Sequence, residues 1–140
     1  MSLSQWWLIA GGSIFLILGL LHAVYTLSDE KRPRRLAPDD PKVLEAMAAS
    51  NVRLSRGGTT MWRAWIGFNL SHSLGAVMFG VACIMTGVLL KTLSPPRAAL
   101  FIPVAIACLY ALLAVRYWFR IPVIGIALAT FSFAAAWLAY

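Results

Sequence analysis

Residues 64–90 read AWIGFNLSHSLGAVMFGVACIMTGVLL, and this run contains no Asp, Glu, Lys or Arg. A helix rises 1.5 Å per residue, so the run makes a helix of roughly 40 Å, longer than the ~30 Å hydrocarbon core of a bilayer. It therefore predicts a membrane-spanning helix that tilts or projects from the bilayer. Lys91 and then Pro95-Pro96 end the run.

Three more apolar runs flank this one. The first is too long for the apolar core of a signal peptide and no basic residue precedes it, so we expect a retained helix. Its ends carry Trp6, Trp7 and Tyr25, aromatic residues typical of membrane interfaces. The sequence predicts an all-α polytopic membrane protein, a four-transmembrane-helix bundle forming a single domain over residues 1–140. The predicted spans cover about 6–27, 64–90, 98–117 and 121–140.

The composition supports this class, because 61% of the 140 residues are hydrophobic and only 12% are charged. Soluble domains carry about 25% charged residues, so the composition argues against a soluble α/β enzyme, a disordered chain and a secreted disulfide protein. Cys83 and Cys108 lie inside apolar runs with no CxxC spacing, which favours small core side chains over redox or metal chemistry.

Charge is concentrated in loop 28–63, which contains all five acidic residues and eight of the twelve basic ones. Arg116 and Arg120 belong to the same predicted face, whereas the opposite face has only Lys91 and Arg97. The positive-inside rule places the first face in the cytoplasm and both termini outside. The net charge of +7 is therefore explained by membrane topology rather than by nucleic-acid binding. The localisation we expect is a bacterial inner (plasma) membrane.

Within the loop, Asp40 can cap a helix whose first residue is Pro41. Gly57-Gly58 follows residues 41–56 as a stop signal. The apolar residues along one side of this segment are Val43, Leu44, Met47, Ala48 and Leu54. We predict a short amphipathic cytoplasmic helix over 41–56 that lies against the membrane surface or the bundle mouth.

Polar residues inside a span are costly, so they are candidate functional groups. Asn69, His72 and Ser73 share one face of the second span. They predict either hydrogen bonds between helices or a ligand site. Small residues also line up, which favours close helix packing within the bundle or between subunits. They are Gly67, Ser71 and Gly75 on the second span, and a comparable groove on the first span is formed by Gly12, Leu16, Gly19 and Ala23.

The only two histidines, His22 and His72, both lie inside predicted spans. Facing each other, they could ligate a haem b, with Gly19 and Gly75 leaving room for the ring. They could otherwise hydrogen-bond Ser, Asn, Tyr or backbone groups. No Asp, Glu or Cys at that depth completes a set of metal ligands, so we expect no metal site.

Arg63, Arg116 and Arg120, with Arg53 and Arg56 nearby, border the predicted cytoplasmic face. They could bind the anionic head of an amphiphile, or snorkel to lipid headgroups. No acid lies in any predicted span, which argues against a Ser-His-Asp triad, paired-carboxylate catalysis and proton pumping.

Two resemblances accompany these patterns. The run GFNLSHSLG at 67–75, after a basic loop, resembles a motif in small uncharacterised bacterial four-span proteins. The order of four spans with a long first loop is also similar to that of the MAPEG superfamily of membrane glutathione transferases and eicosanoid enzymes. On the second span, Arg63-Ala64 followed by Asn69 resembles that superfamily's pattern on its second helix. This resemblance implies a trimer that binds glutathione, with Arg63 and Asn69 at the site.

Three functional hypotheses follow. The first is a non-catalytic protein of the lipid bilayer with one of two roles. It is a subunit, in a homo-oligomer or in a complex with other membrane subunits, or it binds a lipid or another lipophile. The second is a MAPEG-like transferase whose Arg63, Asn69, Arg116 or Arg120 holds an anionic cosubstrate. The third is a haem b protein ligated by His22 and His72.

Overall fold

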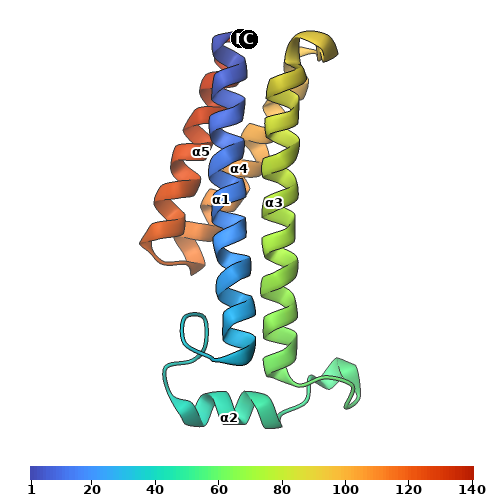
Figure 1. Cartoon of the computed structure of the whole chain (residues 1–140), viewed down its shortest axis with the longest axis vertical. Coiled ribbons are helices and arrows are strands. Elements are labelled where there is room, and N and C mark those ends of the chain that lie inside the picture. Colours follow the sequence, from blue (N-terminus) through green and yellow to red (C-terminus); the bar gives the residue numbers. More distant parts are fainter. The chain divides into compact units, whose positions relative to one another are not determined.

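A computed structural model describes residues 1–140 and contains helices joined by short loops (Figure 1). Two short 3-10 helices, η1 and η2, accompany five α-helices. The order is α1 (Leu3–Lys31), α2 (Pro41–Ala49), η1 (Arg53–Ser55), α3 (Met61–Leu93), η2 (Arg97–Leu100), α4 (Phe101–Tyr117) and α5 (Arg120–Leu138). The prediction of an all-α protein with a short helix in the first loop is confirmed.

Four helical segments are long and apolar enough to cross a membrane, and they match the four predicted spans. They are Leu3–Lys31, Met61–Leu93, Arg97–Tyr117 and Arg120–Leu138. Pro103 and Pro122 both lie in the first turn of their helices, where a missing N–H leaves no hydrogen bond unmade. These four segments indicate a small multi-pass integral membrane protein.

α1 extends beyond the predicted span 6–27 at both ends. At its start, the Ser2 N–H donates to Gln5 Oε1 (2.7 Å) and the Gln5 N–H donates to Ser2 Oγ (3.4 Å). This reciprocal pair is a capping box, which satisfies amide groups that have no partner in the first turn. At the other end the helix continues to Lys31 and so includes Asp29, which the sequence pattern had assigned to the loop.

α2 is shorter than predicted, because it ends at Ala49 rather than at residue 56. Its start is as expected: Asp40 caps it by accepting a hydrogen bond from the Lys42 N–H (2.9 Å), with Pro41 as the first helical residue. Beyond its end, Asn51 and Thr60 form an isolated antiparallel bridge, and the Met61 N–H donates to the Ser50 carbonyl (2.8 Å). These pairings divert the backbone into a closed loop, which a continuing helix could not form.

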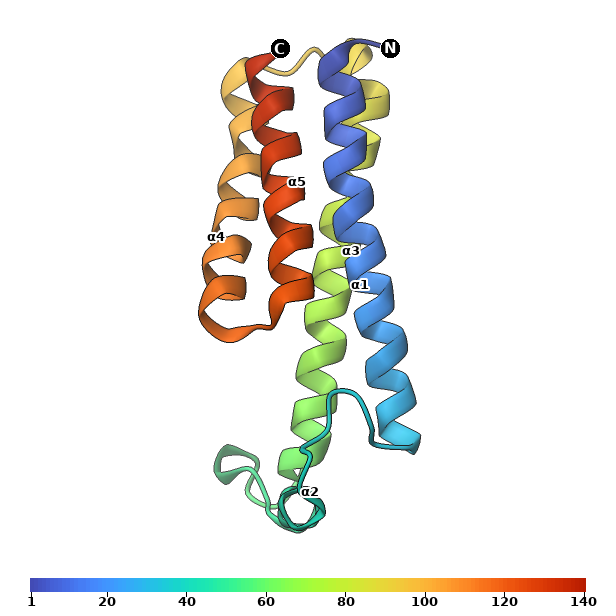
Figure 2. The ribbon, with the colours of Figure 1, turned by 90° about the vertical axis from the view of Figure 1, so that its left-hand side faces the viewer.

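The chain divides into two compact units, Met1–Leu18 with Ala76–Tyr140 and Gly19–Gly75. The first unit holds the four-helix bundle: the beginning of α1, the end of α3, and all of α4 and α5. α4 and α5 form an antiparallel pair joined by Trp118 and Phe119 (Figure 2). The Tyr140 hydroxyl donates to the Pro95 carbonyl (2.9 Å), which holds the end of the chain to the turn after α3.

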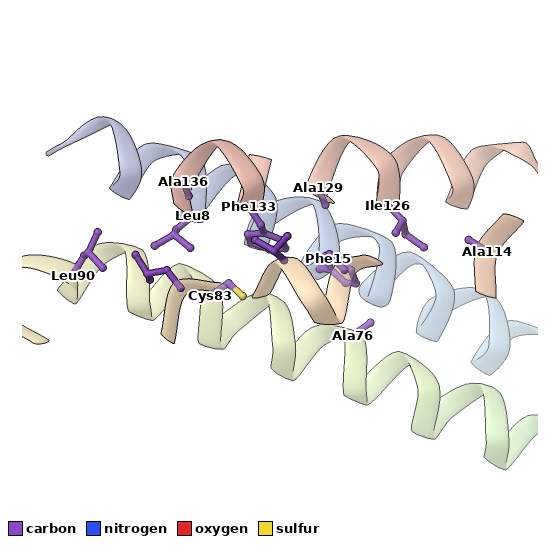
Figure 3. Close-up of a cluster of buried hydrophobic side chains, with 13 residues drawn as sticks. Leu8, Phe15, Ala76, Cys83, Leu90, Ala114, Ile126, Ala129, Phe133 and Ala136 are labelled. Carbon is purple, nitrogen blue, oxygen red and sulfur yellow. The ribbon is translucent and has the colours of Figure 1, made fainter. Parts of the chain in front are cut away.

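Aromatic rings fill the centre of this bundle, where Phe15 and Phe133 are fully buried (Figure 3). The Phe15 ring meets the edges of Phe79 and Tyr110 at centroid distances of 4.8 and 5.3 Å and stacks on Phe133 at 6.1 Å. Small side chains such as Ala129 pack around the rings. Large apolar side chains on the outer faces, such as Leu112 and Phe131, are exposed, as expected for helices that face lipid.

Glycines set the closest approach between α1 and α3 in this unit. A Cβ built on Gly80 would lie 2.6 Å from both the Gly12 carbonyl oxygen and the Leu16 nitrogen, and one on Gly12 would lie 2.7 Å from the Gly80 carbonyl oxygen. These neighbours are backbone atoms, which cannot rotate away. The two helices therefore pack backbone to backbone, as small-residue pairs in membranes allow.

We expect Gly80→Ala to destabilise the protein by about 1–3 kcal/mol, because the added methyl group overpacks a contact made by backbone atoms. The measurement is denaturant or thermal unfolding in mild detergent. Gly67→Ala is the matched control on the same helix, since a Cβ there meets nothing within 4 Å. Equal stability of the Gly80→Ala and Gly67→Ala variants would contradict the packing described here.

Candidate functional site

The polar residues predicted inside the spans meet in the second unit, where α1 and α3 each contribute to one small cluster. The Nε2–H of His22 donates to Asn69 Oδ1 (2.9 Å), which links the two helices. The Asn69 Nδ2 donates to the Trp65 carbonyl (2.8 Å), so the amide nitrogen is already engaged and Oδ1 faces His22 as the acceptor. Asn69 itself is only 5% exposed.

His72 joins this pair from the next turn of α3. Its ring lies edge-to-face against the His22 ring, with 5.5 Å between centroids and 81° between planes. Both rings are partly buried, whereas Phe68, one turn away on α3, is 68% exposed. We call His22, Asn69 and His72 the histidine–asparagine cluster. It is a polar group partly accessible from an apolar surface.

Two neighbouring hydroxyl groups bond within their own helices and do not face outward. Ser73 Oγ donates to the Asn69 carbonyl and Thr26 Oγ1 donates to the His22 carbonyl, both at 2.8 Å. Each side chain is 1% exposed. Ser73, a predicted ligand-binding residue, therefore supports the turn that carries Asn69 and presents no group to a ligand.

The histidine pair does not fit a haem in this arrangement. Bis-histidine ligation needs both rings to point a nitrogen at an iron from opposite faces of a porphyrin. Here the rings of His22 and His72 lie edge-to-face with only 5.5 Å between their centroids, and Nε2 of His22 is bonded to Asn69. The haem hypothesis is therefore not supported by the geometry. No group of three or more His, Cys, Asp or Glu side chains could hold a metal ion.

The predicted arginines lie on exposed surface. Arg63 lies in the first turn of α3 and is exposed, while Asn69 is buried six residues later. Six residues correspond to a rotation of about 240° around a helix, so the two side chains leave different sides of α3 and share no site. Arg116 and Arg120 are exposed at the turn between α4 and α5, and the Arg116 guanidinium lies 5.8 Å from the Tyr117 ring centroid.

The small-residue ladder predicted on the second span is not used for packing around Gly67. A Cβ on Gly67 would meet nothing within 4 Å, and Ser71 and Gly75 are exposed. On the first span Gly12 makes the close contact with Gly80 described above, and Gly19 is buried. The ladder of Gly67, Ser71 and Gly75 is thus an open surface of small residues.

Asp29 is a buried polar residue that the sequence pattern does not identify as a candidate. Its carboxylate accepts backbone N–H groups from the next loop: Arg34 at 3.1 Å from Oδ1, Arg35 at 3.2 Å from Oδ1 and 2.9 Å from Oδ2, and Leu36 at 2.5 Å from Oδ2. The side chain is 1% exposed. An acid in the last turn of a helix opposes the helix dipole, and the loop amide groups offset this unfavourable position. The sequence carries no signal for it, because the predicted span ends at residue 27 and leaves Asp29 in the loop.

Two further contacts hold this loop to the helices. The Trp65 Nε1–H donates to the Leu36 carbonyl (3.0 Å), and the Arg35 guanidinium lies 4.3 Å from the centroid of the Tyr25 ring. The second contact is a cation–π interaction. Together with Asp29 they fold the basic segment after α1 into a fixed turn against α1 and α3.

No protein family, no curated protein and no solved structure matches this chain.

We expect the His22–Asn69 hydrogen bond to contribute about 0.6–2 kcal/mol, the range found for side-chain bonds between membrane helices. A double-mutant cycle with His22→Leu and Asn69→Leu, measured by unfolding in mild detergent, gives this coupling energy. The cycle of His22→Leu with Ser71→Ala is the control, because the Ser71 hydroxyl bonds only to the Phe68 carbonyl of its own helix. A coupling of zero in the first cycle would contradict the bond.

We expect Asp29→Asn to loosen the turn after α1, because an amide has one acceptor oxygen where the carboxylate has two. Limited trypsin digestion should then cut faster after Arg34 and Arg35. Glu30→Gln is the matched control, since Glu30 is the exposed neighbour of Asp29. If both variants are cut at the wild-type rate, Asp29 does not hold the turn.

Proposed function

We propose that this chain is a small integral membrane protein without catalytic activity that binds a lipophilic molecule with a polar head. The head lies at the histidine–asparagine cluster and the apolar part lies along the exposed faces of α1 and α3. One observation carries the proposal: His22 and His72 are partly accessible although they lie in apolar helices. A polar group with a purely internal role would be sealed from lipid.

The surroundings of the cluster suit such a ligand. Exposed apolar side chains border it, including Leu21 next to His22 and Phe68 one turn from His72. Tyr25 and Trp65, aromatic residues of the kind found at membrane interfaces, lie within about two turns of the cluster along their helices. This depth, just inside the interface, is where the head of an amphiphile lies.

A binding role is also consistent with the chemistry of the nearby groups. Imidazole rings donate and accept hydrogen bonds, and so they recognise hydroxyl, carbonyl or phosphate heads. Asp29, the buried acid of this unit, has its carboxylate engaged by backbone amides of its own loop. Support for a catalytic acid or base at the cluster is therefore weaker than support for ligand binding.

The proposed setting is the inner membrane of a bacterium, with loop 28–63 in the cytoplasm and both termini outside. The support is the charge distribution, because ten of the twelve basic residues lie in loop 28–63 or at the α4–α5 turn. Lys91 and Arg97, the remaining two, lie at the turn between α3 and α4.

A second candidate role is that of a subunit, and the open ladder of Gly67, Ser71 and Gly75 favours it. Small residues let helices approach closely in lipid, and this ladder is not occupied at Gly67. Either a second copy of the chain or another membrane protein would fit there.

Native mass spectrometry of the protein released from mild detergent tests the binding proposal. We expect the wild type to carry a bound small molecule and His72→Leu to lose most of it, because the substitution keeps the helix and removes the imidazole. Ser71→Ala, which changes the adjacent exposed residue, should retain it. A wild type with no bound small molecule, or an equally loaded His72→Leu variant, would overturn the proposal.

The same spectra test the subunit role. We expect Gly67→Leu to shift an oligomer or a complex toward the single chain, because the larger side chain blocks close approach at a position that is open in the isolated chain. Its stability as a single chain should stay at the wild-type level. If Gly67→Leu leaves the assembly unchanged, the ladder is not the contact surface.

A further inference from the structure

The loop between α2 and α3 carries the most exposed large apolar side chain of this region. Leu54 lies in η1 and is 95% exposed. The sequence pattern assigned it to the apolar face of a helix over 41–56, but the helix ends at Ala49 and Leu54 lies instead at the tip of loop 50–61. Figure 1 shows this loop as a separate turn beside the first turn of α3.

This loop is held in shape by its own hydrogen bonds. The Val52 N–H donates to the Thr59 carbonyl (3.0 Å), next to the bridge between Asn51 and Thr60. Inside the loop, Ser55 Oγ donates to the Val52 carbonyl (2.7 Å) and accepts from the Thr59 N–H (3.2 Å). The exposure of Leu54 is therefore a property of a closed loop, not of a loose one.

Basic side chains surround the exposed leucine. Arg53 and Arg56 flank it in the chain, and both are exposed. Arg56 adopts a left-handed backbone conformation with φ of 48°, and Gly57 follows with φ of 92°. These two residues reverse the chain two residues after Leu54, so the leucine lies at the tip of the loop with Arg53 and Arg56 on either side in the sequence. An apolar tip with a basic rim complements an anionic lipid surface, where the arginines meet phosphates and the leucine enters the apolar boundary.

The attachment of the loop brings this tip to a membrane surface. Loop 50–61 leads directly into α3, one of the four helical segments that are long and apolar enough to cross a membrane. Trp62 and Trp65 in the first turns of that helix are interfacial in character. The tip is only seven residues before Met61, so a chain embedded by α3 holds Leu54 close to the headgroups.

We propose that the tip formed by Arg53, Leu54 and Arg56 binds the surface of an anionic phospholipid bilayer. Leu54 inserts at the boundary between headgroups and acyl chains, and the two guanidinium groups bind lipid phosphates. The interaction fixes the loop to the membrane in which the helices are embedded. It rests on the membrane location of the chain and does not depend on a ligand at the histidine–asparagine cluster.

Hydrogen–deuterium exchange of the full-length protein in lipid nanodiscs tests this proposal. One set of nanodiscs contains phosphatidylcholine alone, and the other also contains phosphatidylglycerol. We expect residues 52–58 to exchange severalfold more slowly in the anionic nanodiscs. Leu54→Asn should lose this protection and Leu54→Met should keep it. The double variant Arg53→Gln, Arg56→Gln should show no difference between the two lipids.

Folding of the variants is checked in the same experiment, because exchange at residues 34–36, which Asp29 holds, should stay at the wild-type rate. Leu54 makes no buried contact that its substitution would remove. Equal exchange of the wild type in both lipids would overturn the proposal, as would full protection of Leu54→Asn. Protection that arises only when a soluble acidic protein is added would overturn it in favour of a protein partner.

Discussion

The cost of an unsatisfied polar group in a medium without water is the constraint on which this structure depends. In lipid, a hydrogen-bonding group that lacks a partner costs several kcal/mol, so each must find one inside the protein. No buried side-chain nitrogen or oxygen lacks a hydrogen-bond partner. The need for hydrogen-bond partners explains why the chain is helical, since a helix pairs its own backbone groups, and why each buried polar side chain bonds to another group of the protein.

The buried polar residues meet this constraint in four ways, one of which is the set of loop amide groups around Asp29. Ser73 and Thr26 bond to carbonyl groups one turn earlier on their own helices. Gln5 uses the carbonyl groups of Gly87 and Val88 across the bundle, at 3.0 and 3.3 Å. His22 and Asn69 bond to each other. The last pair differs because its partner ring, His72, remains partly accessible, which is why the proposed binding function centres there.

The helices must also pack closely, because in lipid the hydrophobic effect does not drive helices together. At Gly12 and Gly80 the absence of side chains lets the backbones of α1 and α3 touch. The aromatic rings around Phe15 then fill the wider part of the bundle. Dense small-residue contacts and interlocking rings supply the dispersion energy that replaces the hydrophobic effect.

The sequence by itself determined the class of the protein, its four apolar spans, the Asp40 cap and the shared face of Asn69, His72 and Ser73. Such features depend on composition and helical periodicity, which are local. Only the tertiary structure decided that Gly80 packs against Gly12 while Gly67 stays open, that Asn69 bonds His22, and that Asp29 holds the following loop. Periodicity assigns residues to a face of a helix, but the partner of that face depends on how the helices pack. The end of α2 at Ala49 has the same cause, because the pairing of Asn51 with Thr60 competes with helix continuation and joins residues distant in the sequence.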